Sequence, residues 1–223
     1  MAIFEALDVA GRAVRVRSEQ VGRQTLWWMG SAFAANAVLA AIVLAVFGAG
    51  KPGTGHALQI TARFSFLLFW LAYASGGLVL LIGPAAGFLR RHGRDFGLAF
   101  AAAQLVHILL VVWLCWIGAT PGMGVFVFFV PPAVVLYLLV LFSIPTLQQR
   151  LGRTLWTVLR TVGMTYIAYA FAADFVPSAP YGGGTTHVLM YAPFAILSVA
   201  GPVLCALSFA PSLRRYFLQS KSG

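Results

Sequence analysis

The feature that most constrains this chain is the length of its uncharged stretches. Between Asp95 and Arg150 the sequence contains no Asp, Glu, Lys or Arg, and over the whole chain 61% of the residues are hydrophobic and only 9% are charged. This composition is typical of a protein that crosses a membrane several times, and it excludes a water-soluble globular domain. We therefore predict an all-α fold, a polytopic bundle of transmembrane helices.

Apolar runs of the right length predict six membrane-spanning helices. A helix needs about twenty apolar residues to cross the roughly 30 Å of hydrocarbon in a bilayer. The uncharged stretch after Asp95 is too long for one such helix, so the chain has to turn within it, at the segment 120–124 with its proline and glycines. The predicted spans are residues 26–47, 66–89, 96–119, 125–144, 155–176 and 188–210.

The positions of Lys and Arg predict how this bundle is oriented. In the six-span arrangement twelve of these residues fall on one side of the membrane, and Lys51 and Arg63 fall on the other. Since Lys and Arg are retained on the cytoplasmic side, both termini are predicted to be cytoplasmic. The chain then divides into an amphipathic helix on the membrane surface (1–24), a six-helix transmembrane domain (25–212) and a basic tail (213–223).

The same sequence argues against several classes of function. The net charge of +10 is divided by long neutral stretches and forms no basic patch interleaved with aromatic residues, so nucleic acid is not an expected partner. There is no phosphate-binding loop, zinc-ligand series or hydrolase nucleophile elbow. We therefore expect membrane lipids as partners, and we predict no catalytic residue and no stand-alone enzyme.

Polar residues inside the spans are the first candidates for function, because a polar group in hydrocarbon must find a partner. His107 lies about 16 Å along the third span, near the bilayer midplane. Two interpretations stay open: a neutral imidazole that is hydrogen-bonded to a neighbouring helix, or a ligand to haem iron or a proton or quinone contact. Gln104 shares this helical face, and we expect it to hydrogen-bond across helices or to the same ligand.

Arg160 in the fifth span also has two interpretations. Its side chain is long enough to reach the cytoplasmic interface, which is the ordinary behaviour of an arginine at this depth. Alternatively, its planar guanidinium binds an anionic group such as a haem propionate or a lipid phosphate. Asn36 and the Gly83-x-x-x-Gly87 pattern are interpreted as packing devices, an amide that bridges helices and small residues that let backbones approach.

Two sequence motifs carry a resemblance to a known family. The first is Arg94-Asp-Phe-Gly-Leu, followed nine residues later by His107, and the second is the segment 143–152, Ser-Ile-Pro-Thr-Leu-Gln-Gln-Arg-Leu-Gly, which leads to Trp156. In order and spacing they resemble the ferric reductase-like transmembrane family, and within it the haem-binding membrane subunits of bacterial methionine sulfoxide reductase systems. With Thr-Ala-Arg at 61–63 as the entry to the second span, the resemblance covers residues 60–176.

The resemblance implies a six-helix bundle in a bacterial inner membrane that holds b-type haem between facing helices. Such a bundle passes electrons from a cytoplasmic flavin or quinone side towards an outer acceptor, and His107 matches one of the family's haem-ligating histidines. The family's two histidines on helix five correspond here to Leu159 and Ala172, or to Arg160 and Ala173 with the register shifted by one residue. Neither register supplies a histidine, so the usual bis-histidine haem is not expected.

Without the helix-five histidines two alternatives stay open: the chain binds no haem, or it binds one haem b through other residues. Met164 lies about as deep in the fifth span as His107 in the third, so a His107–Met164 pair and a five-coordinate haem on His107 alone are both conceivable, although Met is commonly an adaptable packing residue. The candidate cofactor-binding residues are therefore His107, Gln104, Arg160 and Met164, with His107 as the metal ligand.

Two functions follow from these observations. In the first, the chain is an accessory or scaffold subunit of a membrane-protein complex that keeps a degenerate ferric reductase-like core and has lost the metal site. In the second, it is a transmembrane electron-transfer subunit that carries one altered haem on His107 and works between a quinone and a partner. The missing ligands in the fifth span favour the first, and His107 at the family spacing favours the second.

Overall fold

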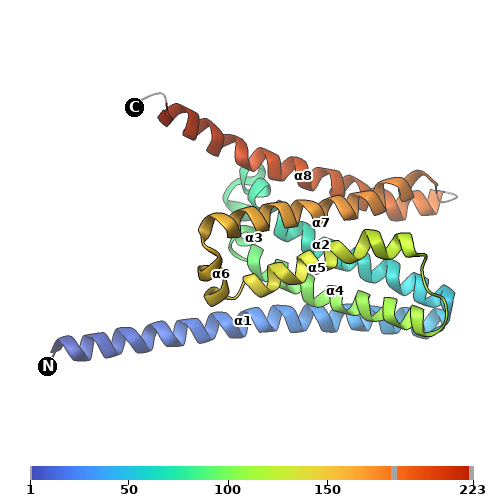
Figure 1. The fold of residues 1–223 in the computed structure, drawn as a ribbon, viewed down its shortest axis with the longest axis horizontal. Helices are drawn as coiled ribbons and strands as arrows, with labels where there is room; N and C mark the ends of the chain where they lie inside the picture. Colours follow the sequence, from blue (N-terminus) through green and yellow to red (C-terminus); the bar gives the residue numbers. More distant parts are fainter. Residues whose placement is uncertain (1, 182–184, 221–223) are drawn as a thin grey trace.

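The chain is helical, as predicted. The computed structural model describes the fold of residues 2–181 and 185–220, with the side chains of 22–177 and 188–207, and there is no strand in these residues. Long helices lie side by side in a bundle, and the start of α1 and the end of α8 lie at the same end of it (Figure 1). The elements are α1 (Ala2–Phe47), α2 (Lys51–Ile82), the 3₁₀ helix η1 (Gly83–Ala86), α3 (Gly87–Arg91), α4 (Gly93–Trp116), α5 (Met123–Phe142), α6 (Pro145–Leu151), α7 (Arg153–Tyr181) and α8 (Thr185–Ser220).

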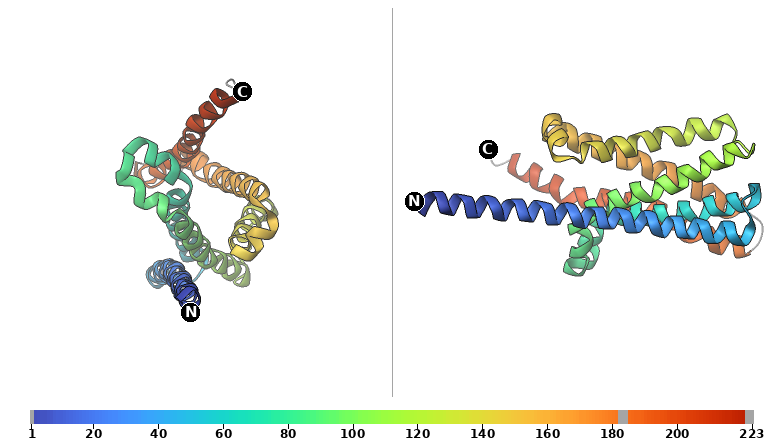
Figure 2. Two further views of the ribbon diagram at one scale, coloured as in Figure 1. Left: turned by 90° about the vertical axis from the view of Figure 1, so that its left-hand side faces the viewer. Right: turned by 90° about the horizontal axis from the view of Figure 1, so that it is seen from below.

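Five stretches of described helix are long and apolar enough to cross a membrane. α7 has 29 residues, which is long enough, but Arg160 and Asp174 interrupt its apolar sequence. It nevertheless runs along the bundle in contact with α5 and α8 (Figures 1 and 2). The five stretches are Gly22–Phe47, Lys51–Arg91, Gly93–Trp116, Met123–Phe142 and Val188–Leu207.

The second long helix begins earlier than predicted, at Lys51 and not at Phe66. Gly48 has a φ of 81°, which lets the chain reverse after α1. Pro52 fits the first turn of the new helix, because no backbone donor is needed there. The segment with glycine and proline, which we expected to be a loop, is therefore a helix start, and 61–63 lies inside α2.

The predicted close packing at Gly83 and Gly87 was wrong. A side chain at either position would meet open space, and Gly83, with a φ of 72°, ends α2 instead. The chain then forms η1 and α3, which project sideways from the bundle (Figure 2). A close approach occurs earlier in α2, where a Cβ on Gly77 would collide with the backbone of Leu204 in α8.

The terminal segments continue the outermost helices. α1 runs without a break from Ala2 to Phe47, so no loop separates 1–24 from the first span, and α8 continues to Ser220. The side chains that would form the amphipathic face of 1–24, and those of the basic tail 213–223, lie outside the described side chains. The surface position of the N-terminal segment therefore stays a prediction.

Phenylalanine rings fill the interior between α2, α4, α7 and α8. Neighbouring ring centroids lie 5.1 to 6.5 Å apart, in the range at which aromatic pairs attract beyond the burial of their area. Phe66 and Phe69 are almost completely buried. We refer to these rings as the aromatic core, which comprises Phe66, Phe69, Phe100, Phe171, Phe175 and Phe194.

Candidate functional site

His107 lies in α4, and its ring is hydrogen-bonded to α2. Its Nδ1 is 3.1 Å from Oγ1 of the buried Thr61. The Thr61 hydroxyl donates to the Ala57 carbonyl at 2.9 Å, so its oxygen is available to accept the hydrogen of Nδ1. This geometry is that of an imidazole joining two helices.

Asn36 of α1 belongs to the same contact of α1, α2 and α4. It is fully buried, and its Nδ2 donates to the Ala103 carbonyl at 2.8 Å and to Ser65 Oγ at 3.4 Å. The predicted packing role of Asn36, an amide that bridges helices, is confirmed. We refer to Asn36, Thr61, Ser65 and His107 as the polar cluster.

Gln104 lies next to this cluster along α4 without joining its hydrogen bonds. Its Oε1 is buried and has no hydrogen-bond partner in the described part of the chain, so the expected bond across helices is not made by this oxygen. Asn36 Oδ1 is likewise buried without a hydrogen-bond partner among the described residues. Buried acceptors of this kind are what internal water molecules bind.

The two family-like motifs meet around a cavity in another part of the interior. Arg94 Nη2 donates to the carbonyl oxygen of Ser143 at 3.1 Å, which ties the start of α4 to the end of α5. Between these helices and α7 lies a cavity of about 210 Å³. We refer to it as the arginine cavity, and its lining includes Arg94, Gln148, Trp156, Arg160 and Met164.

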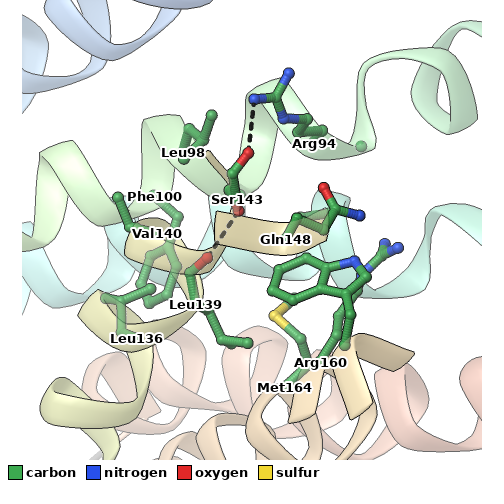
Figure 3. A pocket seen from close by; sticks show the side chains of 14 residues that line it. Arg94, Leu98, Phe100, Leu136, Leu139, Val140, Ser143, Gln148, Arg160 and Met164 are labelled. Carbon is green, nitrogen blue, oxygen red and sulfur yellow. Dashed lines mark hydrogen bonds between the residues drawn. The ribbon is translucent and has the colours of Figure 1, made fainter. Parts of the chain in front are cut away.

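The arginine cavity has a polar side and an apolar side. Gln148 and Arg160 lie across it from Phe100, Leu136 and Val140 (Figure 3). No Asp or Glu is among its lining residues. A more open hollow of about 350 Å³ adjoins it and shares Gln148 in its lining. The site therefore combines fixed positive charge with an apolar wall.

Asp95 follows Arg94 in the sequence but is turned towards α1. Thr25 Oγ1 donates to Asp95 Oδ1 at 2.9 Å, and Asp95 does not line the cavity. Arg160 is exposed and makes no hydrogen bond or ion pair with another described residue. Neither of the two arginines is therefore neutralised by a described carboxylate.

The aromatic core separates the arginine cavity from the polar cluster. Along α4 the order is Gly97 at the cavity, Phe100 at the boundary between the cavity and the aromatic core, and His107 in the polar cluster. Along α2 the same order is kept by Ala72, Phe69, Phe66 and Thr61. Met164 lines the cavity, so the structure does not bring His107 and Met164 together.

The arginine cavity, as it stands in the described structure, does not fit a porphyrin. Leu159, at one of the family's ligand positions, packs against the buried hydrophobic cluster that includes rings of the aromatic core, and Phe171, next to Ala172, belongs to that core. A cavity of about 210 Å³ is small beside the roughly 300–1,000 Å³ of ordinary ligand pockets, and neither His107 nor Gln104 lines it.

Arg63, which we predicted to lie on the outer side of the membrane, lies within α2 and against two rings of α8. Its guanidinium carbon lies 4.6 Å from the ring centroid of Tyr191 and 5.6 Å from that of Phe194, both in α8, and its charge acts on Asp174 of α7. Arg63 therefore joins α2 to α7 and α8 through cation–π and charge contacts. A prediction that α2 begins at Lys51 would have placed Arg63 inside this helix.

Of the four candidate cofactor-binding residues, the structure places Arg160 and Met164 together at the arginine cavity. It places His107 and Gln104 beyond the aromatic core. Three further cavity residues belonged to the quoted motifs without being recognised as site residues. They are Arg94, Gln148 and Trp156. The signal that could have found them is that both motifs mark helix ends on the same side of the bundle.

Comparison with protein-family models, with curated proteins and with solved structures gives no match to this chain. The resemblance to the ferric reductase-like family therefore rests on the two motifs alone. In this structure both motifs contribute residues to the lining of the arginine cavity.

Proposed function

We propose that this chain is an accessory or scaffold subunit of a membrane-protein complex, built on a ferric reductase-like core that has lost its haem. The observation that carries the proposal is the aromatic core, because its rings occupy the interior between the facing helices. His107 is engaged with Thr61, and Leu159 and Ala172 offer iron no nitrogen. In this proposal the chain acts in a bacterial inner membrane through its lipid- and partner-facing surfaces.

The absorption spectrum of the purified chain tests this proposal. The full chain is extracted in mild detergent from cells supplied with a haem precursor, and the spectrum is recorded after reduction with dithionite. We expect no Soret or α band above background. A haem content near one per chain would overturn the proposal.

The scaffold role makes a second expectation that concerns partners. In the membranes where the chain is naturally produced, we expect native electrophoresis to place it in an assembly larger than its own 23.9 kDa. Deleting the chain should lower the amount of the assembled complex. Migration as a single chain, with no other membrane protein affected by the deletion, would contradict a scaffold role.

The electron-transfer alternative has one structural observation in its favour. A hydrogen bond at His107 Nδ1 is the arrangement that orients an imidazole for metal binding through Nε2. In this alternative His107 is the ligand of one haem b, and the chain works between a quinone and a partner. If the spectrum shows haem, His107→Ala should abolish it, and unchanged haem content would rule out this ligand.

We also propose that six helices cross the inner membrane, α7 included, with both termini in the cytoplasm. The start of α1 and the end of α8 lie at one end of the bundle (Figure 1), and an even number of crossings accounts for this placement. Most described arginines outside the helix interiors, in α3, at the start of α4 and around α6, lie at that same end. This is the distribution expected of the cytoplasmic side.

Single cysteines at exposed positions test this arrangement in a chain whose Cys115 and Cys205 are replaced by Ala. We expect a membrane-impermeant maleimide to label Lys51→Cys and Pro177→Cys from outside, and to label Arg91→Cys only after the membrane is opened. The reverse pattern would contradict the orientation. Protection of Pro177→Cys together with external labelling of Lys51→Cys would contradict a crossing by α7.

A further inference from the structure

The arginine cavity holds positive charge that the described structure leaves without a counterion. Arg94 of α4, Arg160 of α7 and Gln148 of α6 all line it, Arg94 beside the Ser143 carbonyl and Gln148 on the same side as Arg160 (Figure 3). The adjacent carboxylate, Asp95, is bonded to Thr25 of α1. Guanidinium groups are planar donors that match the oxygens of a phosphate. The polar side of the cavity therefore has the chemistry of an anion site.

The shape of the cavity limits what such an anion can be. Its volume of about 210 Å³ is below the roughly 300–1,000 Å³ of ordinary ligand pockets, so it can hold a headgroup but not a whole phospholipid. Its opposite wall is apolar and includes the buried Phe100, Leu136 and Leu139. A ligand that is anionic at one end and apolar at the other satisfies both walls, whereas a small, fully hydrated anion leaves the apolar wall unused.

The cavity also lies where such a ligand has access from the bilayer. α4 and α5 are consecutive but pack on each other only lightly, since α4 packs mainly on α1 and α2, and α5 mainly on α7. The cavity lies between α4 and α5, near the end of the bundle that is rich in arginine. Chains attached to a bound headgroup can leave through this contact into the hydrocarbon.

We propose that the arginine cavity binds a phosphate group between Arg94 and Arg160, and that in the membrane this phosphate is the headgroup of an anionic phospholipid. Gln148 donates to its free oxygens, and the acyl chains follow α5. The site goes beyond the accessory role and does not depend on it. Anionic lipids gather on the side of the membrane where arginines are retained.

Lipid titrations of the full chain in detergent test the proposal by native mass spectrometry. The ligands are phosphatidylglycerol and phosphatidylcholine with the same acyl chains, and we expect the first to bind more tightly. Arg160→Gln should weaken phosphatidylglycerol binding about fivefold, and Arg94→Gln with Arg160→Gln roughly thirtyfold. Binding of phosphatidylcholine should change little in either variant.

A matched control removes the same charge elsewhere at this end. Arg90 and Arg91 of α3 are exposed and do not line the cavity, so Arg90→Gln with Arg91→Gln should leave phosphatidylglycerol affinity within about twofold if only general charge attraction is lost. Equal losses in the two double variants would overturn the proposal. Equal affinities of the parent chain for the two lipids would overturn it as well.

Competition identifies the source of the phosphate. Glycerol 3-phosphate that displaces the lipid at similar concentrations would keep the phosphate site and assign it to a soluble compound. Failure to displace assigns the site to the lipid. A neutral quinone that displaces phosphatidylglycerol, with binding insensitive to Arg160→Gln, would overturn the proposal in favour of a quinone pocket.

The single variant keeps the test valid if the double variant does not fold. Arg160 is exposed and forms no described hydrogen bond, so Arg160→Gln leaves the packing intact, whereas Arg94 also binds the Ser143 carbonyl. Arg160→Lys, which keeps the charge without the planar fork, should recover part of the affinity. Failure of these experiments would leave the haem spectrum, and with it the accessory role, unaffected.

Discussion

The polar cluster and the arginine cavity are both made of polar side chains inside one helical bundle, but they use these side chains in opposite ways. In the polar cluster, Asn36 is fully buried and bonds to α2 and α4, and His107 is bonded to Thr61. In the arginine cavity, Arg160 is exposed and bonds to no described residue. A closed polar contact joins helices, whereas an open one leaves its donors available to a ligand.

The aromatic core is what keeps these two regions apart. Its rings lie between them along both α2 and α4, so a cofactor cannot contact both regions without displacing several phenylalanines. This separation also explains why similar depth in the bilayer was a poor guide to proximity. His107 and Met164 lie at similar depth in the predicted spans but on different sides of the aromatic core.

Removing a ring from the aromatic core should have the largest effect on stability. Phe66 contacts four other rings of the core and is 1% exposed. Phe66→Ala should therefore lower the free energy of unfolding by about 3–5 kcal/mol, measured by denaturant unfolding in detergent. The matched change Met164→Ala, at the wall of the open cavity, should cost clearly less. Equal losses would mean that the core is no better packed than the cavity.

The helix contact at Gly77 should be the next most sensitive position. A Cβ there would collide with the backbone of Leu204, so Gly77→Ala should separate α2 from α8 and cost about 1–3 kcal/mol. Gly87→Ala is the control, because a Cβ at Gly87 meets nothing within 4 Å. It should be neutral, or stabilising by up to about 1 kcal/mol. A larger loss of stability for Gly87→Ala than for Gly77→Ala would mean that helices pack closely at Gly83 and Gly87 after all.

Much of the fold could be predicted from the sequence, because transmembrane helices follow from the length of apolar runs. The third and fourth spans were predicted within three residues of α4 and α5 at each end. The start of α2 could not be, since glycine and proline at 48–55 are compatible with a loop and with a helix start. The consequence was that Arg63 was assigned to the outer side of the membrane, before the second span, whereas it lies within α2 against the rings of α8.

The candidate site could be predicted only in part. Intramembrane polarity correctly selected Asn36 as a bridge between helices, because that judgement depends on one residue and its depth. Arg160 lines a cavity, and its role as an anion ligand stays a prediction. The grouping of Arg160 with Arg94 and Gln148 depends instead on how α4, α6 and α7 pack. Helix packing of this kind is not encoded in the period or spacing of a single helix.

The hydroxyl of Thr61 offers a smaller and more specific test of the polar cluster. Thr61→Val keeps the shape of the side chain but removes the partner of His107 Nδ1, so it should cost about 1 kcal/mol. Thr157→Val in α7 is the control, since that exposed hydroxyl bonds only to Arg153 of its own helix, and it should change little. If the two variants unfold alike, the bond between Thr61 and His107 does not join α2 to α4.

The smallest expected effect concerns the residue that keeps Asp95 away from the arginine cavity. Thr25→Val removes the hydrogen bond from Oγ1 to Asp95 and should cost less than about 1 kcal/mol in stability. The freed carboxylate can then turn towards Arg94, so phosphatidylglycerol affinity in the lipid titration should fall roughly twofold.

Asp95→Asn added to Thr25→Val provides the control for this effect. It removes the competing charge, and lipid affinity should return to the parent value or rise above it. If Thr25→Val instead leaves lipid binding unchanged, the orientation of Asp95 has no influence on the cavity. The openness of the arginine cavity to anions would then be set by Arg94 and Arg160 alone, and the contact with α1 would belong with the closed polar contacts that serve only to join helices.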